Sequence, residues 1–314
     1  MPLSDGYPPD RLDPEVAEAI KMLPFDDVTA EVLPPLRVRF AMPVSDLVER
    51  TDHDVPGDPP VPVRVHRAHG ADGVLPCVYS IHGGGYVLGT NLMDDVFFDK
   101  ACPKLGVVGA SVDYRLAPET PYPGPLEDCY RGLRWTYEHA EALGIDPNCI
   151  GVMGVSAGGG LAAALCLLAR DRGEVPIAFQ LLDQPMLDDR QRTPSSQDAD
   201  LAVWTRNSNT FGWKAYLGDL YGRDDVPPTA APARAADLSG LPPTFVSVGA
   251  VDGFRDEDVD YATRLNQAGV PTELHVYPGA CHGFNLMAPE AAVSKQCTTN
   301  MLHWLRAQLN RTDT

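Results

Sequence analysis

The sequence contains no hydrophobic run long enough to cross a lipid bilayer. Its longest apolar stretch, residues 161–169, is about half of the roughly 18 residues that a membrane-spanning helix needs. The first ten residues, MPLSDGYPPD, have carboxylates and prolines where a signal peptide has a basic start and an apolar core. We therefore expect a soluble, cytoplasmic protein with no membrane partner.

Positive charge is also scarce. The 25 Lys and Arg residues stand against 43 Asp and Glu residues, which gives a net charge of −18. No basic cluster offsets this charge locally, so a nucleic acid is excluded as an expected partner. The seven cysteines are scattered without a Cys-x-x-Cys pair, so neither a disulfide framework nor a zinc site is indicated.

What the sequence does contain, from about residue 61 onward, is an alternation of short β-branched runs with helical patterns. We predict strands over residues 61–68, 75–81, 107–114, 149–155, 177–182, 244–249 and 273–277, and helices over 13–23, 125–143, from 157, 255–268 and 291–309. Buried strands that alternate with helices are typical of an α/β protein whose mostly parallel sheet is covered on both faces.

Two segments break this rhythm. Residues 1–60 are rich in proline and carboxylates, and residues 187–228 lack the alternation but contain four aromatic residues, Trp204, Phe211, Trp213 and Tyr216. We interpret the second segment as an insertion that folds over another part of the protein. Its aromatic side chains suit either the lining of a pocket or ordinary packing, and the sequence leaves both open.

A candidate nucleophile lies between a predicted strand and a predicted helix. Residues 154–158 read Gly-Val-Ser-Ala-Gly, a G-x-S-x-G pattern centred on Ser156. A serine on a tight strand-to-helix turn needs small neighbours on both sides, and its hydroxyl then projects above the edge of the sheet. We predict that Ser156 is a nucleophile.

A run of glycines follows another predicted strand, in His82-Gly-Gly-Gly85. Consecutive glycines let backbone N–H groups point toward one place, as a developing oxyanion requires. We assign Gly84, Gly85 and the amide of Ala157 as oxyanion donors, with Gly83 as a substitute for one of them. His82 is expected to brace the loop rather than to react.

A serine nucleophile needs a histidine to accept its proton and a carboxylate to orient that histidine. Among eight histidines, His282 is favoured because it follows the last predicted strand, where a side chain reaches over the sheet edge. Asp252 is the first carboxylate after the preceding strand. The order Ser156, Asp252, His282 is that of α/β-hydrolases. This chemistry needs no metal and no organic cofactor.

The chain resembles the bacterial hormone-sensitive-lipase-like (family IV) esterases. The resemblance rests on HGGG at 82–85, DYRLAPE at 113–119, GVSAGGG at 154–160, FRDED at 254–258 and HGF at 282–284. It implies an α/β-hydrolase fold with a helical cap, and hydrolysis of short-acyl carboxylic esters by a Ser-His-Asp triad through an acyl-enzyme. Tyr114 and Arg115 are then expected to hold the oxyanion loop. Relatives often form dimers, so a homodimer is left open.

The implied domain organisation matches the two irregular segments. Residues 1–60 and the insertion 187–228 are expected to build the cap, while 61–186 and 229–314 form the catalytic domain. The chain departs from the family pattern at Val155, Gly253, Cys281 and Asn285. Cys281, beside His282, is the one thiol whose modification is expected to affect activity. A ligand-binding protein without turnover and an amidase or peptidase remain the alternative functions.

Overall fold

The computed structural model describes residues 11–21, 27–37 and 44–310. Its centre is an eight-stranded sheet in the order β1-β2-β4-β3-β5-β6-β7-β8. The pairs β1/β2 and β2/β4 are antiparallel, and the remaining pairs are parallel. The strands are β1 (Val48–Val55), β2 (Val61–Ala68), β3 (Leu75–Ile81), β4 (Val108–Val112), β5 (Ile145–Val155), β6 (Gln180–Asp183), β7 (Thr244–Gly249) and β8 (Thr272–Tyr277).

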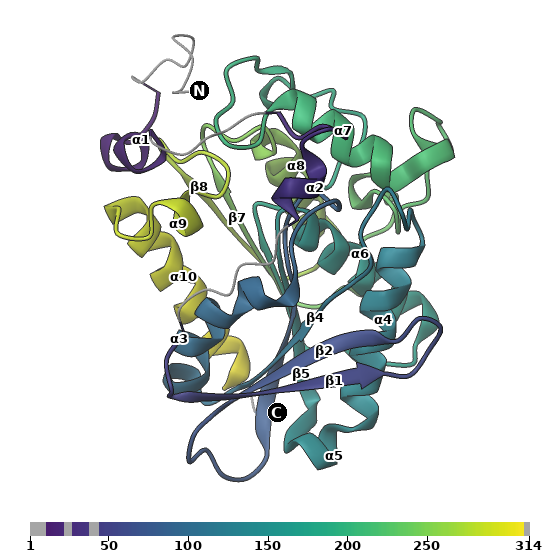
Figure 1. Ribbon diagram of the computed structural model, residues 1–314, viewed down its shortest axis with the longest axis vertical. Coiled ribbons are helices and arrows are strands. Elements are labelled where there is room, and N and C mark those ends of the chain that lie inside the picture. The colour runs from purple at the N-terminus through teal and green to yellow at the C-terminus, as the bar shows by residue number, and fades with distance from the viewer. Residues whose placement is uncertain (1–10, 22–26, 38–43, 311–314) are drawn as a thin grey trace.

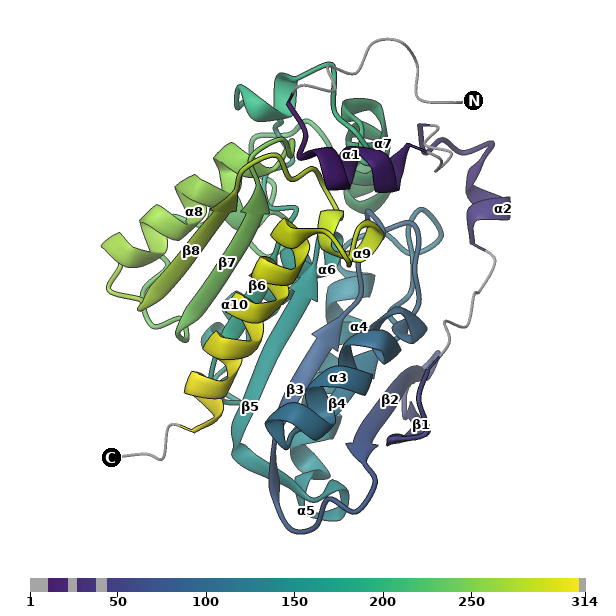
Figure 2. The same ribbon diagram turned by 90° about the vertical axis from the view of Figure 1, so that its left-hand side faces the viewer.

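Helices cover both faces of the sheet (Figure 1 and Figure 2). One buried cluster joins the sheet to α4, α6 and α8, and a second joins it to α1, α3 and α10. The predicted α/β class, with a mostly parallel sheet between helical layers, is confirmed. The α-helices are α1 (Pro14–Ile20), α2 (Leu33–Leu36), α3 (Asp95–Leu105), α4 (Gly124–Glu138), α5 (Ala140–Leu143), α6 (Ala157–Arg172), α7 (Arg206–Leu217), α8 (Arg255–Gln267), α9 (Phe284–Met287) and α10 (Ala292–Leu309).

The central strands are apolar along their whole length because both of their faces are covered. In β3, Val78 packs into the cluster of α3 and α10, whereas Cys77, Tyr79 and Ile81 pack into the cluster of α4 and α6. Successive side chains of a strand point to opposite faces, so each face of the sheet receives alternate residues. This burial on two sides fixes the register of the strands whose ends carry the site.

The structure differs from the predicted elements mainly at the first edge of the sheet. β1 lies within residues 1–60, which were assigned as a whole to the cap segment. Its sequence, VERTDHDV, is polar because only its two ends are buried at this edge of the sheet. The division into cap and catalytic domain stays a prediction.

The N-terminal segment reaches α7 of the insertion near the carboxyl ends of the strands. The backbone amide of Val28 donates to Ser208 Oγ at 2.9 Å, and Asn207 Nδ2 donates to Asp27 Oδ2 at 2.7 Å. Both α1 and α7 lie at the same end of the sheet in the two views (Figure 1 and Figure 2). Among the described helices, none combines the length and the apolar character that a membrane span requires.

Candidate active site

Ser156 occupies the sharp turn between β5 and α6, at the carboxyl end of the sheet. Its backbone has φ 57° and ψ −122°, a strained conformation for a residue with a side chain. A Cβ on Gly154 would come within 2.1 Å of the Gly158 carbonyl oxygen, and one on Gly158 within 2.0 Å of the Ile81 carbonyl oxygen. Both glycines are therefore steric requirements of this turn.

The structure brings Ser156, His282 and Asp252 into one hydrogen-bonded row. His282 Nε2 lies 2.9 Å from Ser156 Oγ, and His282 Nδ1 lies 2.8 Å from Asp252 Oδ2. The other oxygen of Asp252 accepts a hydrogen bond from the Phe254 amide at 3.0 Å. All three side chains of the row are buried. In this geometry the imidazole can take the serine proton while the carboxylate fixes its tautomer.

The acid and the base come from the loops that follow two neighbouring strands. Asp252 follows β7 and His282 follows β8, and these strands run parallel, so both loops leave the same edge of the sheet. The loops are packed closely, because the Val251 amide donates to the Ala280 carbonyl at 2.9 Å. A Cβ on Gly249 would approach that same carbonyl oxygen to 2.2 Å. The row thus rests on main-chain contacts as well as on its own hydrogen bonds.

The glycine loop after β3 lies against the nucleophile turn. A Cβ on Gly83 would meet the Val155 carbonyl oxygen at 3.0 Å and the Ser156 Cβ at 3.4 Å. Gly84 and Gly85 adopt φ values of 118° and 59°, which glycine tolerates best. Within the described residues, no hydrogen bond uses the amides of Gly84, Gly85 or Ala157 as donors. These N–H groups remain available to a ligand beside Ser156.

The side chains of His82 and Tyr114 support this glycine loop. Their rings stack at a centroid distance of 4.2 Å, and the Tyr114 hydroxyl donates to the His82 carbonyl at 3.0 Å. Arg115 instead makes a paired contact with Asp128 of α4, at 2.7 and 2.8 Å. Tyr114 therefore contacts the loop as predicted, while Arg115 anchors the segment after β4 to a helix.

The four aromatic residues of the insertion occupy different environments. Trp204 lies against the glycine loop, since a Cβ on Gly85 would come within 2.1 Å of its indole ring, and its ring centroid is 6.5 Å from that of His282. Trp213 and Tyr216 are buried and pack on the ring of Tyr86. Phe211 lines a cavity of about 380 Å³ with residues of α2. Of the four, Trp204 is the one whose ring contacts both the glycine loop and the neighbourhood of His282.

A group of buried polar residues next to the Ser156–His282 pair was not predicted from the sequence. Asp183 ends β6 and Gln184 follows it, and both are buried. Both contact Asn285, which the sequence analysis mentions only as a departure from the family pattern. Burial raises the pKa of the Asp183 carboxyl group, against the effect of hydrogen bonds from Asn285 and Ser247. The rule that placed Asp252, a polar residue just past a buried strand, applies equally to Gln184.

Two further buried carboxyl groups lie at the start of α8. Glu257 accepts hydrogen bonds from the amides of Leu187 and Asp188 at 2.8 and 3.0 Å. Asp258 is fully buried, and neither of its oxygens has a hydrogen-bond partner among the described residues. Burial raises the pKa of both side chains well above the ordinary carboxyl value, because it disfavours the charged form.

Cys281 is buried beside the row, and burial raises the pKa of its thiol to about 12. A thiol with such a pKa is a poor nucleophile at neutral pH. Among the described residues, no group of His, Cys, Asp and Glu side chains is arranged to hold a metal ion. The expectation that the reaction uses no cofactor stays a prediction.

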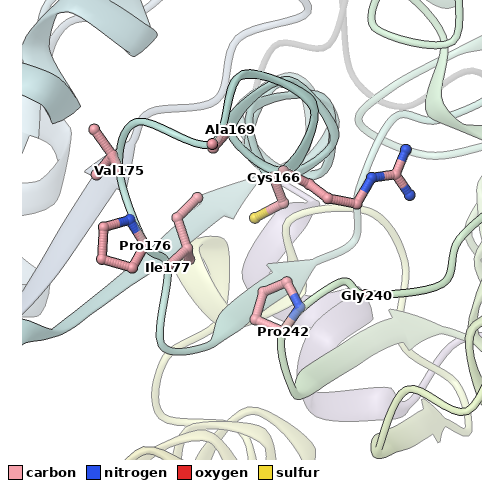
Figure 3. Close-up of a pocket in the computed structure, with 9 residues that line it drawn as sticks. Cys166, Ala169, Val175, Pro176, Ile177, Gly240 and Pro242 are labelled. Atoms are coloured by element: carbon pink, nitrogen blue, oxygen red, sulfur yellow. The ribbon is translucent and has the colours of Figure 1, made fainter.

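A cavity of about 400 Å³ lies at the opposite end of the sheet (Figure 3). Its lining is mainly aliphatic and comes from the end of α6 and the turns before β6 and β7, including Cys166, Ile177 and Pro242. The Arg170 guanidinium at this cavity already donates to the carbonyls of Asp237 and Ser239. This cavity is therefore separate from the row of Ser156, His282 and Asp252.

Comparisons with known proteins agree with the fold. Residues 78–286 match the family model described as alpha/beta hydrolase fold. Carboxylesterase NlhH of Mycobacterium tuberculosis is 40% identical over 270 residues, which are 83% of this chain and 81% of that protein. Esterase LipI of the same organism is 33% identical over 307 residues, which are 95% of this chain and 96% of that protein.

Solved structures show the same similarity. A bacterial heroin esterase superposes with a TM-score of 0.89 at 44% identity, over 96% of this chain and 99% of that one. Esterase LipW from Mycobacterium marinum superposes with a TM-score of 0.85 at 36% identity, over 96% and 97% of the two chains. With the motifs that it shares, the chain belongs to the α/β-hydrolase family, in its hormone-sensitive-lipase-like branch.

Proposed function

We propose that this protein is a serine carboxylesterase that hydrolyses short-acyl carboxylic esters of small molecules through Ser156, His282 and Asp252. The coarser statement, that the chain is a carboxylic ester hydrolase, follows from its family and from relatives named as carboxylesterase, esterase and carboxylic ester hydrolase. The single observation that carries the finer proposal is the hydrogen-bonded row, with contacts of 2.9 and 2.8 Å, beside glycine-loop amides that donate no hydrogen bond to any described residue.

The proposed reaction has two halves. In the first, Ser156 Oγ attacks the ester carbonyl carbon while His282 Nε2 takes the hydroxyl proton, and the carbonyl oxygen becomes an oxyanion facing the amides of Gly84, Gly85 and Ala157. The carbon–oxygen bond to the alcohol then breaks, and His282 gives its proton to the departing alcohol. In the second half, water attacks the acyl-enzyme by the same route and releases the carboxylic acid and the free serine.

The preference for short acyl groups is supported by Trp204. Its indole ring lies against Gly85, and its centroid is 6.5 Å from that of the His282 ring, so it limits the space on that side of a bound ester carbonyl. Replacing this ring with a methyl group opens that space without touching the row itself. We expect Trp204→Ala to raise the ratio of kcat/KM for an octanoate ester over a butyrate ester by about tenfold. This is the effect of burying about two of the four extra methylenes, at about 0.8 kcal/mol each. An unchanged ratio would remove this role from Trp204.

The main experiment measures hydrolysis of p-nitrophenyl butyrate by the wild type and by Ser156→Ala. We expect Ser156→Ala to lose at least 10³-fold in kcat, since the nucleophile is gone. Ser111→Ala is the matched control, because Ser111 is also buried but lies on β4 away from the row. Equal activity of the wild type and Ser156→Ala would reject the proposal.

Two further measurements separate the alternatives. A ligand-binding protein without turnover would not be acylated, whereas we expect a fluorophosphonate probe to label one serine per chain. An amidase would cleave a matched amide at a rate comparable to the ester, and we expect the ester to be strongly preferred. Faster cleavage of emulsified long-chain triglyceride than of dissolved butyrate ester would contradict the short-acyl assignment.

A further inference from the structure

The end of β6 contacts both sides of the Ser156–His282 pair. On the nucleophile side, the Asp183 carbonyl accepts a hydrogen bond from the Ser156 amide at 2.9 Å, and the Met186 amide donates to the Ser156 carbonyl at 2.9 Å. Residues 183–186 therefore hold the backbone of the nucleophile turn from both directions. Gln184 lies in the middle of this segment, and its side chain points away from these bonds toward the loop that contains His282.

The Gln184 side chain holds the base loop. Its Oε1 accepts a hydrogen bond from the Gly283 amide at 2.7 Å, and Gly283 is the residue directly after His282. Its Nε2 donates to Asn285 Oδ1 at 3.3 Å. Asn285 Nδ2 in turn donates to Asp183 Oδ2 at 2.8 Å, which ties the beginning of α9 to the end of β6.

The backbone of Gln184 indicates that this contact is specific. Gln184 has φ 51°, a conformation that residues with side chains rarely adopt. Its amide donates to the Ser247 carbonyl of β7 at 2.6 Å, and its side chain is fully buried. A disfavoured backbone conformation persists where the surrounding contacts require it, and here those contacts lead directly to the residues beside Ser156 and His282.

Asp252 alone does not fix the position of the imidazole ring. Its hydrogen bond reaches one ring nitrogen, whereas the approach of the other nitrogen to Ser156 Oγ depends on where the backbone of the loop lies. A displacement of about 1 Å between reacting groups can lower the rate about 10²-fold. A backbone contact at Gly283 controls that displacement, because it immobilises the residue adjacent to His282.

We propose that Gln184 is a positioning residue that sets the distance between Ser156 Oγ and His282 Nε2 by holding the Gly283 amide, with Asn285 and Asp183 as its supports. This inference rests on the proposed esterase function. It gives the end of β6 a role in the reaction in addition to the three residues of the row. This role acts through the loop that contains His282 and involves no contact with the substrate.

The test compares substitutions of two glutamines, Gln184 just past β6 and Gln180 at its start. Gln184→Met keeps the length of the side chain but removes the acceptor for the Gly283 amide. Gln180→Met is the control, because Gln180 is a buried glutamine at the other end of β6, where its Nε2 donates to Thr244 Oγ1 at 2.9 Å. Gln184→Gly is the second variant, because glycine accepts φ 51° readily and so adds no backbone strain.

We expect Gln184→Met and Gln184→Gly to lower kcat for p-nitrophenyl butyrate about 10- to 100-fold, with KM changed less than about threefold. Ethyl butyrate should lose about a further tenfold, because its alkoxide leaving group needs protonation by His282 and nitrophenolate does not. Rates are normalised to sites titrated with a fluorophosphonate, so a partly unfolded sample does not imitate the effect. Gln180→Met should stay within about twofold of the wild type.

Normalised rates of both Gln184 variants within twofold of the wild type would overturn the inference, as would equal losses for the two esters. Ser156→Ala is measured in the same series. If Ser156→Ala is inactive and the Gln184 variants are fully active, only the positioning role fails. If Ser156→Ala matches the wild type, the proposed function fails and the positioning role fails with it.

Discussion

The two ends of the parallel sheet make their turns with different residues. The left-handed positions in the turns that lead into the amino ends of β3 to β8 are all glycines, namely Gly70, Gly73, Gly106, Gly144, Gly173, Gly240 and Gly269. At the carboxyl ends, residues with side chains adopt positive φ as well, among them Tyr86, Ser156 and Gln184. The turns at the amino end use only glycine, which adopts such a conformation without strain, whereas the carboxyl end uses both glycines and residues with side chains.

This difference locates the destabilising features of the molecule. A left-handed conformation costs a residue with a side chain about 1–2 kcal/mol. The carboxyl end also contains the buried carboxyl groups of Asp183, Asp252, Glu257 and Asp258. Strain and buried acids persist where side chains of a definite type are needed, so their concentration at one end is itself an indication of a functional site.

The largest effect that we expect comes from adding one methyl group at the carboxyl end of the sheet. In Gly158→Ala the new Cβ would lie 2.0 Å from the Ile81 carbonyl oxygen, so the glycine loop and the nucleophile turn must separate. We expect a loss of at least about 100-fold in kcat/KM and of several kcal/mol in the free energy of unfolding. Steady-state kinetics and urea denaturation measure the two losses.

The matched substitution at the amino end is Gly173→Ala. Gly173 has φ 66° and no atom within 4 Å of an added Cβ. Only the backbone strain of about 1–2 kcal/mol should appear, with kcat unchanged. If both variants lost activity to the same extent, the contrast between the two ends of the sheet would not hold.

The next effect concerns the buried acid Asp258 and depends on pH. Burial raises its pKa well above the ordinary value, and the neighbouring carboxyl groups of Glu257, Asp252 and Asp183 act in the same direction. Above about pH 4 the unfolded chain releases this proton and the folded chain retains it. The wild type therefore loses up to about 1.4 kcal/mol per pH unit relative to a variant without the acid, until the raised pKa is reached.

We accordingly expect Asp258→Asn to match the wild type in stability near pH 4 and to exceed it increasingly as the pH rises from there toward the raised pKa. Asp260→Asn is the control, since Asp260 lies on the same helix but is exposed. Its difference from the wild type should stay below about 0.5 kcal/mol across the range. Urea denaturation at several pH values measures both, and a difference for Asp258→Asn that does not grow with pH would contradict the buried neutral acid.

The sequence predicts the central sheet well because its strands are buried on both faces. The expected bounds 61–68, 75–81 and 244–249 coincide with β2, β3 and β7. β1 was missed because an edge strand needs few apolar residues, and VERTDHDV has them only at its ends. The helix expected over 125–143 divides at His139 into α4 and α5, a break that the apolar pattern does not reveal.

The candidate site was likewise predicted only in part from the sequence. Ser156, Asp252 and His282 were predicted because each follows a strand at the carboxyl edge, where loops of a parallel sheet converge. Gln184 satisfies the same rule but was not singled out, because the direction of its side chain depends on a φ of 51° that the sequence does not reveal. The raised pKa of Asp258 depends on full burial at the start of a helix, a position where the sequence suggests only that an acid suits the helix dipole.

A smaller effect separates strain from chemistry at the nucleophile turn. Ser156→Gly and Ser156→Ala both remove the hydroxyl group, but only glycine relieves the conformation with φ 57°. We expect both variants to be inactive and Ser156→Gly to be more stable than Ser156→Ala by about 1 kcal/mol. Urea denaturation of the two variants gives this difference, and equal stability would show that the turn is not strained.

The smallest expected effect is that buried cysteines resist alkylation. This prediction tests whether the carboxyl end of the sheet, where the strained residues lie, opens to solvent. Cys281 lies beside His282 and Cys166 lines the cavity at the other end of the sheet, and both thiols are buried with raised pKa values. Of the seven cysteines, all within the described residues, only Cys149 is partly exposed. Because alkylation requires an accessible thiolate, iodoacetamide at pH 8 should modify Cys149 first and leave esterase activity unchanged. Peptide mass spectrometry identifies the modified residue. Early modification of Cys281 with parallel loss of activity would mean that the carboxyl end opens in solution, whereas early modification of Cys166 would assign that opening to the amino end.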